Sequence, residues 1–211
     1  MAGTIGPHQT PPMTSPIVLQ KARLRSRMRA WLKTVSLADF QAASARACGR
    51  LVEKCLWQRA HAVLLYAPLP DELDLWPILG IALAEGKTVV LPRYRPDLKT
   101  YDGARVMDLT QDVAPGFYGI REPKAEAPSF SLKLLDLVLV PAVALGLDGC
   151  RLGRGKGFYD RLLAKVSGTK CGVAFDQQVQ AQLPAEVHDI RLDCILTPTR
   201  WLDVRPRPVR T

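Results

Sequence analysis

The spacing of apolar residues predicts two helices at the start of the chain. Between Leu24 and Val35 apolar residues recur every three or four positions and basic residues occupy the other faces, which predicts an amphipathic helix over residues 15–34. Ser36 and Asp39 resemble a capping box with Asp in the acidic position. They predict a second helix that follows Leu37 and continues towards Trp57.

Short apolar runs then alternate with segments of helical period. The runs at 62–66, 87–91, 135–140, 170–175 and 194–197 predict strands, and the segments 75–84 and 159–166 predict helices. Pro68, Pro92 and Pro141 are expected to end the first three strands. Residues 94–131 are rich in loop-forming residues, with one further strand near 105–108. This alternation predicts an α/β fold with a mostly parallel sheet that helices cover on both faces.

Length and charge narrow the class of protein. The 211 residues suffice for one α/β core, which we expect at 17–204 as a single domain, between a disordered N-terminal tail at 1–16 and a C-terminal tail at 205–211. The chain has 29 Lys and Arg against 20 Asp and Glu, a formal charge of +9. This excess favours anionic partners such as nucleotides, nucleic acid, acidic metabolites or acidic lipid.

The cysteines and the apolar runs indicate a soluble protein of a reducing, cytoplasmic compartment. Five cysteines without a CxxC pair argue against a disulfide framework and a thiolate zinc site. No apolar run approaches the roughly 18 to 20 residues of a membrane span. No acidic residue precedes Asp39 while basic residues cluster between Lys21 and Arg29, a composition that organellar transit peptides share, so that alternative stays open.

The segment 151–160, RLGRGKGFYD, is the best candidate for chemistry. Its glycines stand at alternate positions and enclose Arg154 and Lys156. Glycine allows positive φ and lets backbone N–H groups approach an anion, and a helix beginning near Phe158 would add its positive end. The segment therefore predicts a phosphate-binding loop. It matches neither the Walker nor the dinucleotide spacing, so an exposed basic turn or an RNA contact remains an alternative.

Two aspartates downstream are candidate magnesium ligands. Asp160 closes the loop, and Asp189 lies in the segment HDIRLD. Magnesium takes about one or two carboxylates from a protein and completes its shell with water and phosphates. The alternatives are a first-turn helix acid for Asp160, and a helix cap or a partner of Arg191 for Asp189. We interpret His188 as a polar loop residue, because neither a nucleophile nor a metal cluster accompanies it.

Glu72, Lys21 and Arg25 each allow a plain and a functional interpretation. Glu72, in the acidic segment PLPDELD, is either a solvated carboxylate or an acceptor for the donor edge of a heterocycle such as a pterin or purine. Lys21 and Arg25 lie one helical turn apart and form a solvated face, an RNA-contacting stripe or an arm that reaches a phosphate.

Taken together and in order, six motifs resemble the 5-formyltetrahydrofolate cyclo-ligase family, whose members are also called methenyltetrahydrofolate synthetases. The glycine motif RLGRGKGFYDR at 151–161 is quite specific, and the other motifs gain weight from their order. They are KARLR at 21–25, PDELD at 70–74, LPRYR at 91–95, YGIREP at 118–123 and HDIRLD at 188–193. The resemblance covers residues 21 to 197.

The resemblance implies a three-layer α/β/α fold similar to the ribose-phosphate isomerase and CoA-transferase group, with ATP as co-substrate and Mg²⁺ as cofactor. By matched position, Arg154 and Lys156 are the implied catalytic residues, and Asp160 and Asp189 are the implied metal ligands. The implied ATP-binding residues are Lys21, Arg25, Arg151, Gly153, Arg154, Gly155, Lys156, Gly157 and Tyr159. The implied folate-binding residues are Glu72, Arg154, Gly155, Lys156, Gly157 and Phe158.

The implied reaction converts 5-formyltetrahydrofolate, with or without a polyglutamate tail, to 5,10-methenyltetrahydrofolate through a phosphorylated formyl group, and releases ADP and phosphate. No nucleic acid or membrane partner is implied. The alternative is a non-catalytic relative that binds a nucleotide or RNA on the same scaffold. One departure concerns position 146, five residues before Arg151, where family members usually carry Asp and this chain has Gly146; the nearest acid is Asp148.

Overall fold

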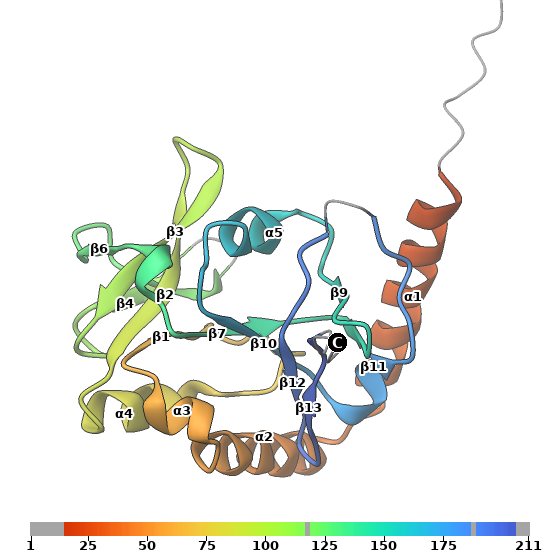
Figure 1. Ribbon diagram of the computed structural model, residues 1–211, viewed down its shortest axis with the longest axis horizontal. Helices are drawn as coiled ribbons and strands as arrows, with labels where there is room; N and C mark the ends of the chain where they lie inside the picture. The colour runs from red at the N-terminus through yellow and green to blue at the C-terminus, as the bar shows by residue number, and fades with distance from the viewer. Residues whose placement is uncertain (1–14, 117–118, 187–188, 206–211) are drawn as a thin grey trace, which may run out of the picture.

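A central sheet organises the protein. The computed structural model describes residues 15–116, 119–186 and 189–205. Expectations for Tyr118, His188 and the terminal segments 1–14 and 206–211 lie outside these residues. The sheet has eight strands in the order β13-β12-β10-β7-β1-β2-β3-β6 (Figure 1). The parallel strands are β1 (Ala62–Leu64), β2 (Thr88–Arg95), β7 (Leu137–Pro141), β10 (Thr169–Val173) and β12 (Cys194–Leu196).

Antiparallel strands extend the sheet at both edges, and smaller sheets lie beside it. β3 (Thr100–Val106) and β6 (Ser129–Phe130) continue from β2, and β13 (Trp201–Asp203) pairs with β12. A second sheet contains β8 (Ala144–Gly146), β9 (Arg151–Leu152) and β11 (Val179–Gln180), and a third contains β4 (Val113–Pro115) and β5 (Arg121–Pro123). Two short 3-10 turns are η2 (Leu132–Leu134) and η3 (Asp176–Gln178).

Helices cover both faces of the sheet, as predicted. Successive strand residues point to opposite faces, so Val63 packs with α2 (Leu37–Val52), α3 (Cys55–Arg59) and α4 (Trp76–Ala84), while Leu64 packs with α5 (Phe158–Leu163). Figure 1 shows α2 to α4 below the sheet, α5 above it and α1 (Pro16–Leu32) along one side. Met28 of α1 packs against β8 and β9. The fold is therefore a three-layer α/β/α arrangement.

The second helix is shorter than predicted. Ser36 caps α2, accepting the Asp39 N–H at 3.1 Å, and its hydroxyl donates to Asp39 Oδ2 at 2.7 Å. The helix then ends at Val52, Lys54 is extended with φ −82° and ψ 132°, and α3 begins at Cys55. This break lets Trp57 become fully buried, with its indole N–H donating to Glu85 at 3.0 Å.

Pro92 does not end its strand, contrary to the prediction. β2 runs through it to Arg95, and Pro92 pairs with Gly103 of β3. The Val90 carbonyl points towards β1, where it accepts the Leu65 N–H at 3.0 Å. Two residues later the Pro92 nitrogen points to the same side, beyond the end of β1 at Leu64, so no ladder hydrogen bond is lost there.

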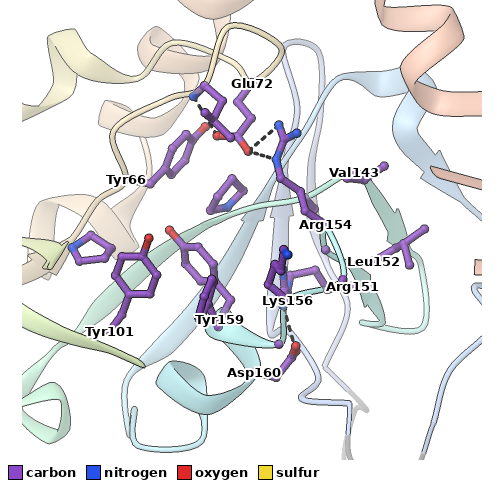
Figure 2. Close-up of a pocket in the computed structure, with 18 of the residues that line it drawn as sticks. Tyr66, Glu72, Tyr101, Val143, Arg151, Leu152, Arg154, Lys156, Tyr159 and Asp160 are labelled. Atoms are coloured by element: carbon purple, nitrogen blue, oxygen red, sulfur yellow. Dashed lines mark hydrogen bonds and ion pairs between the residues drawn. The ribbon is translucent and has the colours of Figure 1, made fainter. Parts of the chain in front are cut away.

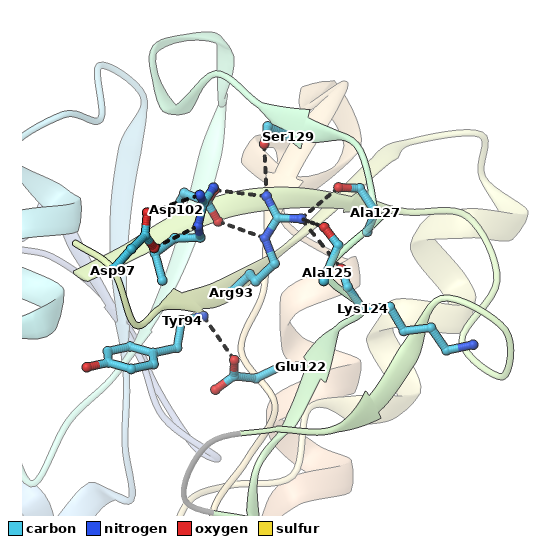
Figure 3. Close-up of polar contacts among 10 residues, drawn as sticks. Arg93, Tyr94, Asp97, Asp102, Glu122, Lys124, Ala125, Ala127 and Ser129 are labelled. Atoms are coloured by element: carbon cyan, nitrogen blue, oxygen red, sulfur yellow. Dashed lines mark hydrogen bonds and ion pairs between the residues drawn. The ribbon is translucent and has the colours of Figure 1, made fainter. Parts of the chain in front are cut away.

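Residues 94–131 are also more ordered than predicted. They contain the whole of β3, β4, β5 and β6. Arg93 fixes this region: its guanidinium donates to Asp102 Oδ1 and Oδ2 at 3.1 and 2.9 Å, to the carbonyls of Ala125 and Ala127 at 2.9 and 2.7 Å, and to the Ser129 hydroxyl at 2.8 Å (Figure 3). Arg93 is only 6% exposed, so this network is internal.

None of the described helices combines the length and the apolar character that a membrane crossing requires.

Candidate functional site

The carboxyl ends of β1 and β7 border a cavity of about 440 Å³ (Figure 2). This is where ligands collect in open α/β sheets. The structure brings every predicted site residue to this cavity, from four separate segments of the chain. They are Lys21, Arg25, Glu72, Arg151, Gly153, Arg154, Gly155, Lys156, Gly157, Phe158, Tyr159, Asp160 and Asp189. Their roles stay predictions; their convergence is a property of the fold.

The glycine loop connects β9 to α5 along one wall of the cavity. Gly155 and Gly157 have φ of +95° and +65°, the left-handed region that side chains other than glycine rarely adopt. Gly157 is the residue that precedes α5. The predicted helix is only six residues long, so its dipole adds less positive potential than the sequence suggested. The cations and the backbone N–H groups of the loop therefore carry most of its attraction for anions.

Lys21 ties α1 to the segment that carries Asp189. Its ammonium donates to Glu186 Oε2 at 2.7 Å and to Asp189 Oδ2 at 2.9 Å, and the residue is 8% exposed. Burial alone would lower the pKa of Lys21, but the two carboxylates outweigh it and hold the pKa above its ordinary value. Lys21 is therefore a fixed positive charge at the cavity. The sequence did not single out Glu186, which lies 165 residues from Lys21.

Arg151 and Asp160 form a second ion pair, on the floor of the glycine loop. Arg151 Nη2 donates to Asp160 Oδ1 at 2.9 Å, and its guanidinium lies 5.5 Å from the centre of the Tyr159 ring. The Arg151 side chain is almost fully buried, whereas Asp160 is one third exposed. The arginine is thus held in place from β9, and the carboxylate keeps a face towards solvent.

Arg154 joins the glycine loop to the loop that follows β1, across the cavity (Figure 2). Its Nε and Nη2 donate to Glu72 Oε1 at 3.2 and 3.1 Å, and Nη2 also contacts Asp71. Glu72 Oε2 accepts the Leu69 N–H at 3.1 Å. Burial of the Glu72 carboxylate raises its pKa above the ordinary value, although the Leu69 N–H and Arg154 oppose the shift.

Aromatic residues form the apolar wall of the cavity. Tyr66 is buried and donates its hydroxyl to the Leu73 carbonyl at 2.9 Å. The Tyr101 and Phe158 rings meet edge to face with centroids 5.2 Å apart. Burial raises the pKa of Tyr159, so its phenol stays protonated. Sequence reasoning missed Tyr66 and Tyr101. Tyr66 follows β1 and precedes the PDELD motif, and Tyr101 lies in β3 opposite Tyr94 of the LPRYR motif. These positions next to motifs were the available signal.

Four of the cations that line the cavity, Arg25, Arg29, Arg121 and Lys156, form no ion pair with a described residue. Within residues 15–116, 119–186 and 189–205, Lys156 makes no ion pair. Arg25 Nε donates to the Gly153 carbonyl at 2.9 Å and so steadies the loop. Arg121, which the sequence did not single out, lies flat on Trp76, 3.8 Å from the ring centre. Lys156 is the cation best placed to meet an incoming anion.

Asp148 fills the space beside Gly146. Its Oδ1 lies where a Cβ on Gly146 would be, and it accepts the Cys150 N–H at 3.2 Å. Its Oδ2 accepts from Arg191 at 2.9 Å. Burial alone would raise the pKa of Asp148, but these hydrogen bonds hold it below its ordinary value. A carboxylate, that of Asp148, therefore holds the segment just before the glycine loop.

The carboxylates that line the cavity would supply only part of the coordination shell of a divalent cation. In the part of the chain that the structure describes, no group of three or more His, Cys, Asp or Glu side chains is arranged to hold a metal. Asp160 and Asp189 both line the cavity. Two carboxylates are enough for magnesium when phosphate and water oxygens complete the shell.

Comparisons with known proteins agree on one family. The family model described as the 5-formyltetrahydrofolate cyclo-ligase family matches residues 18–198. A probable 5-formyltetrahydrofolate cyclo-ligase from Caenorhabditis elegans is 29% identical over 83% of this chain and 91% of its own length. The 5-formyltetrahydrofolate cyclo-ligase of Mycolicibacterium smegmatis is 34% identical over 67% of this chain and 76% of its own length. The NMR structure of Aquifex aeolicus 5,10-methenyltetrahydrofolate synthetase superposes with a TM-score of 0.82 at 31% identity, covering 90% of this chain and 96% of that one.

Proposed function

The chain belongs to the 5-formyltetrahydrofolate cyclo-ligase family of enzymes, and on this premise we propose that its cavity converts 5-formyltetrahydrofolate to 5,10-methenyltetrahydrofolate with ATP as co-substrate. The observation that carries the proposal is the convergence of Lys156, Asp160 and Glu72 on one cavity. It joins a phosphate-binding loop to a carboxylate suited to a heterocycle.

One end of the cavity binds the ATP phosphates in this proposal. Lys21 and Arg25 supply charge from α1 and Arg151 from β9, and the backbone N–H groups of Gly153, Gly155 and Gly157, which line the cavity, would donate to the phosphates. Tyr159 borders the nucleotide from α5. Lys156 and Arg154 meet the transferring phosphoryl group, and Lys156 is free of ion pairs among the described residues. Such transfers depend mainly on positioning and on neutralisation of charge.

The other end binds the folate. Glu72 accepts hydrogen bonds from the donor edge of the pterin, and its low exposure of 12% makes these bonds strong. Arg154 must then leave Glu72 or share it. Phe158 and the loop residues Gly155, Lys156 and Gly157 border the formyl group. The phenols of Tyr66 and Tyr159 stay neutral and enclose the ring.

The chemistry follows from the weakness of a formamide as an electrophile. The formyl oxygen attacks the γ-phosphorus, the bond to the β-phosphate oxygen breaks, and ADP leaves an iminium phosphate on the folate. The anilino nitrogen then attacks the formyl carbon and loses its proton, and the C–O bond breaks with release of phosphate. The fixed cations hold the attacking and leaving groups together. The ring should therefore close faster in the cavity than in solution.

Asp160 and Asp189 are the residues that would hold magnesium. The ion would neutralise charge on the phosphates and order them. Asp160 is paired with Arg151, and Asp189 is paired with Lys21.

Further features are consistent with the remaining expectations. The five cysteines are free thiols, which supports a cytoplasmic location. We also propose that residues 17–204 act as one domain. The rival proposal of a non-catalytic RNA- or nucleotide-binding relative is not favoured, because every cation expected at the phosphates lines the cavity.

A direct test measures methenyl product by absorbance with and without ATP and magnesium. We expect product only when both are present. Lys156→Ala should lower kcat about 100- to 1,000-fold, as loss of a donor to the reacting centre does. Lys33→Ala, an exposed lysine of the same charge, should leave the rate unchanged. Wild-type turnover in Lys156→Ala would contradict the phosphate role.

A further inference from the structure

The turn that follows β1 presents two adjacent carboxylates to the glycine loop. The Glu72 N–H donates to the Leu69 carbonyl at 2.9 Å, and the Glu72 side chain accepts the Leu69 N–H at 3.1 Å, so two hydrogen bonds close the turn 69–72. Pro70 stands at the second position of the turn, where its fixed φ fits. Asp71 and Glu72 are therefore held side by side.

The two carboxylates have different surroundings but share one arginine. Glu72 lines the cavity and its side chain is 12% exposed, whereas the Asp71 side chain is 37% exposed and is not part of the lining. Arg154 Nη2 donates to both Asp71 Oδ1 and Glu72 Oε1, and Nε donates to Glu72 Oε1 (Figure 2). Burial alone would lower the pKa of Arg154, but the hydrogen bond to Asp71 and the charge of Glu72 hold it above its ordinary value. The proposed function gives Glu72 a role and leaves Asp71 without one.

The acceptor sites on Glu72 show where a folate would compete with Arg154. A carboxylate oxygen offers about two lone pairs, and Oε1 already accepts two N–H groups from Arg154. Oε2 accepts one, from Leu69. A heterocycle that donates two parallel hydrogen bonds needs a site on each oxygen. At least one bond from Arg154 to Oε1 must therefore break when the pterin binds Glu72.

Asp71 decides which of these bonds can break. Nη2 still has a carboxylate partner in Asp71 after it releases Glu72, so this donor is not left unpaired. In the segments 15–116, 119–186 and 189–205, Nε has Glu72 alone as acceptor and Nη1 has none. Nη1 is therefore left for the oxygens of a phosphoryl group, while Nη2 remains on Asp71.

We propose that Asp71 is a positioning residue for Arg154: it holds the guanidinium beside the transferring phosphoryl group while Glu72 binds the folate. The inference rests on the proposed function, in which Arg154 meets that group and Glu72 accepts hydrogen bonds from the pterin. Asp71 touches neither substrate and acts through Arg154. With this support, Arg154 can give up part of its pairing with Glu72 and keep its place in the cavity.

The test measures kcat and KM for 5-formyltetrahydrofolate in Asp71→Ala. We expect kcat to fall about 10-fold, because a charge-assisted hydrogen bond that orients Arg154 is lost. KM for the folate should rise about 2- to 5-fold, because Arg154 then stays on Glu72 and competes with the pterin. Asp71→Glu keeps the carboxylate and should recover most of both losses. The matched control Asp203→Ala removes an exposed aspartate that pairs with Arg205 outside the cavity, and it should behave as the wild type.

A double variant separates positioning from support of the fold. In an Arg154→Ala background, Asp71→Ala should cause no further loss of kcat/KM, because Asp71 acts through the arginine that is already missing. A further loss in that background would show that Asp71 acts independently of Arg154. Wild-type kcat in Asp71→Ala would show that Arg154 needs no such support. Either result overturns the inference.

Two measurements keep the test decisive. Thermal unfolding reports whether Asp71→Ala folds; if it does not, Asp71→Asn, which keeps the shape of the turn residue and loses its charge, should show the fall in kcat, and an unchanged kcat would overturn the inference. Product formation by the wild type tests the proposed function separately. Its absence would contradict that function and this inference together, whereas an active wild type with an unaffected Asp71→Ala would contradict this inference alone.

Discussion

Arg93 and Arg154 are both paired with carboxylates, but they differ in what surrounds them. Arg93 is 6% exposed and binds one carboxylate, a hydroxyl and backbone carbonyls. The Arg154 side chain is 34% exposed, and among the described residues its hydrogen-bond partners are the side chains of Asp71 and Glu72. Backbone carbonyls cannot move away without unfolding the segment that carries them, whereas carboxylate side chains can rotate.

This difference in exposure and partners shows which arginine is available to a ligand. Removal of Arg93 would leave buried acceptors without a donor, which is costly. Removal of Arg154 would leave two carboxylates that water can reach at least in part. Arg93 therefore supports the fold, and Arg154 can exchange partners when an anion arrives.

The largest effect should come from Arg93→Ala. We expect the free energy of unfolding to fall by about 3 to 5 kcal/mol, because a buried ion pair loses one member. Urea unfolding measures this, and Arg95→Ala on the same strand, whose side chain is 39% exposed, should cost less than about 1 kcal/mol. The folded fraction of Arg93→Ala should retain kcat. A stability like that of the wild type would contradict the structural role.

Arg154→Ala should lower the activity strongly and the stability little, the reverse of Arg93→Ala. We expect kcat/KM to fall about 100-fold, or roughly 2.7 kcal/mol, with a change in unfolding free energy below about 1 kcal/mol. Arg154→Lys keeps the charge but loses the planar fork, so it should recover only part of the rate. If Arg154→Ala lowered stability as much as Arg93→Ala, the proposed contrast would be wrong.

Glu72→Gln should have the smallest effect of the three substitutions. It should also change how the stability and KM depend on pH. KM for the folate should rise about 10-fold, or roughly 1.4 kcal/mol, because a charged acceptor is lost. Burial raises the pKa of Glu72 above 4.5, so ionisation disfavours the folded state. The wild type therefore loses some stability as the pH rises from 4.5 through the raised pKa.

Glu72→Gln cannot ionise and should not lose stability in that range. Thermal unfolding at pH 8 should show the variant at least as stable as the wild type, with the advantage gone below pH 4.5. The KM of the wild type should rise as the pH falls through the same range, and that of the variant should stay flat. Parallel pH profiles would show that Glu72 does not contact the substrate.

The two arginines also differ in how far the sequence predicted their surroundings. Apolar periodicity predicted the parallel strands, and the family resemblance implied that Glu72 and Lys156 belong to one site. Arg93 had no such signal. Its partners lie up to 36 residues away in a segment with little periodicity, so the sequence indicated only loops there.

Other differences have similar causes. The strand through Pro92 depended on where its neighbour β1 ends, which local composition does not contain. The pairing of Lys21 with Glu186 spans 165 residues. β13 was missed because it is three residues long and pairs after a short turn. Local patterns thus predicted the elements, while the ionic partners were set by tertiary contacts.

The carboxylate of Asp148 has a consequence for reading related chains. Position 146 would look defective in an alignment, because an acid is missing there, yet an oxygen of Asp148 stands in the volume that a side chain at 146 would occupy. A carboxylate therefore lies beside position 146, although it belongs to a residue two positions further along the chain. Surveys that score family members column by column would discard such a chain as inactive, whereas a survey that compares atoms in space would retain it.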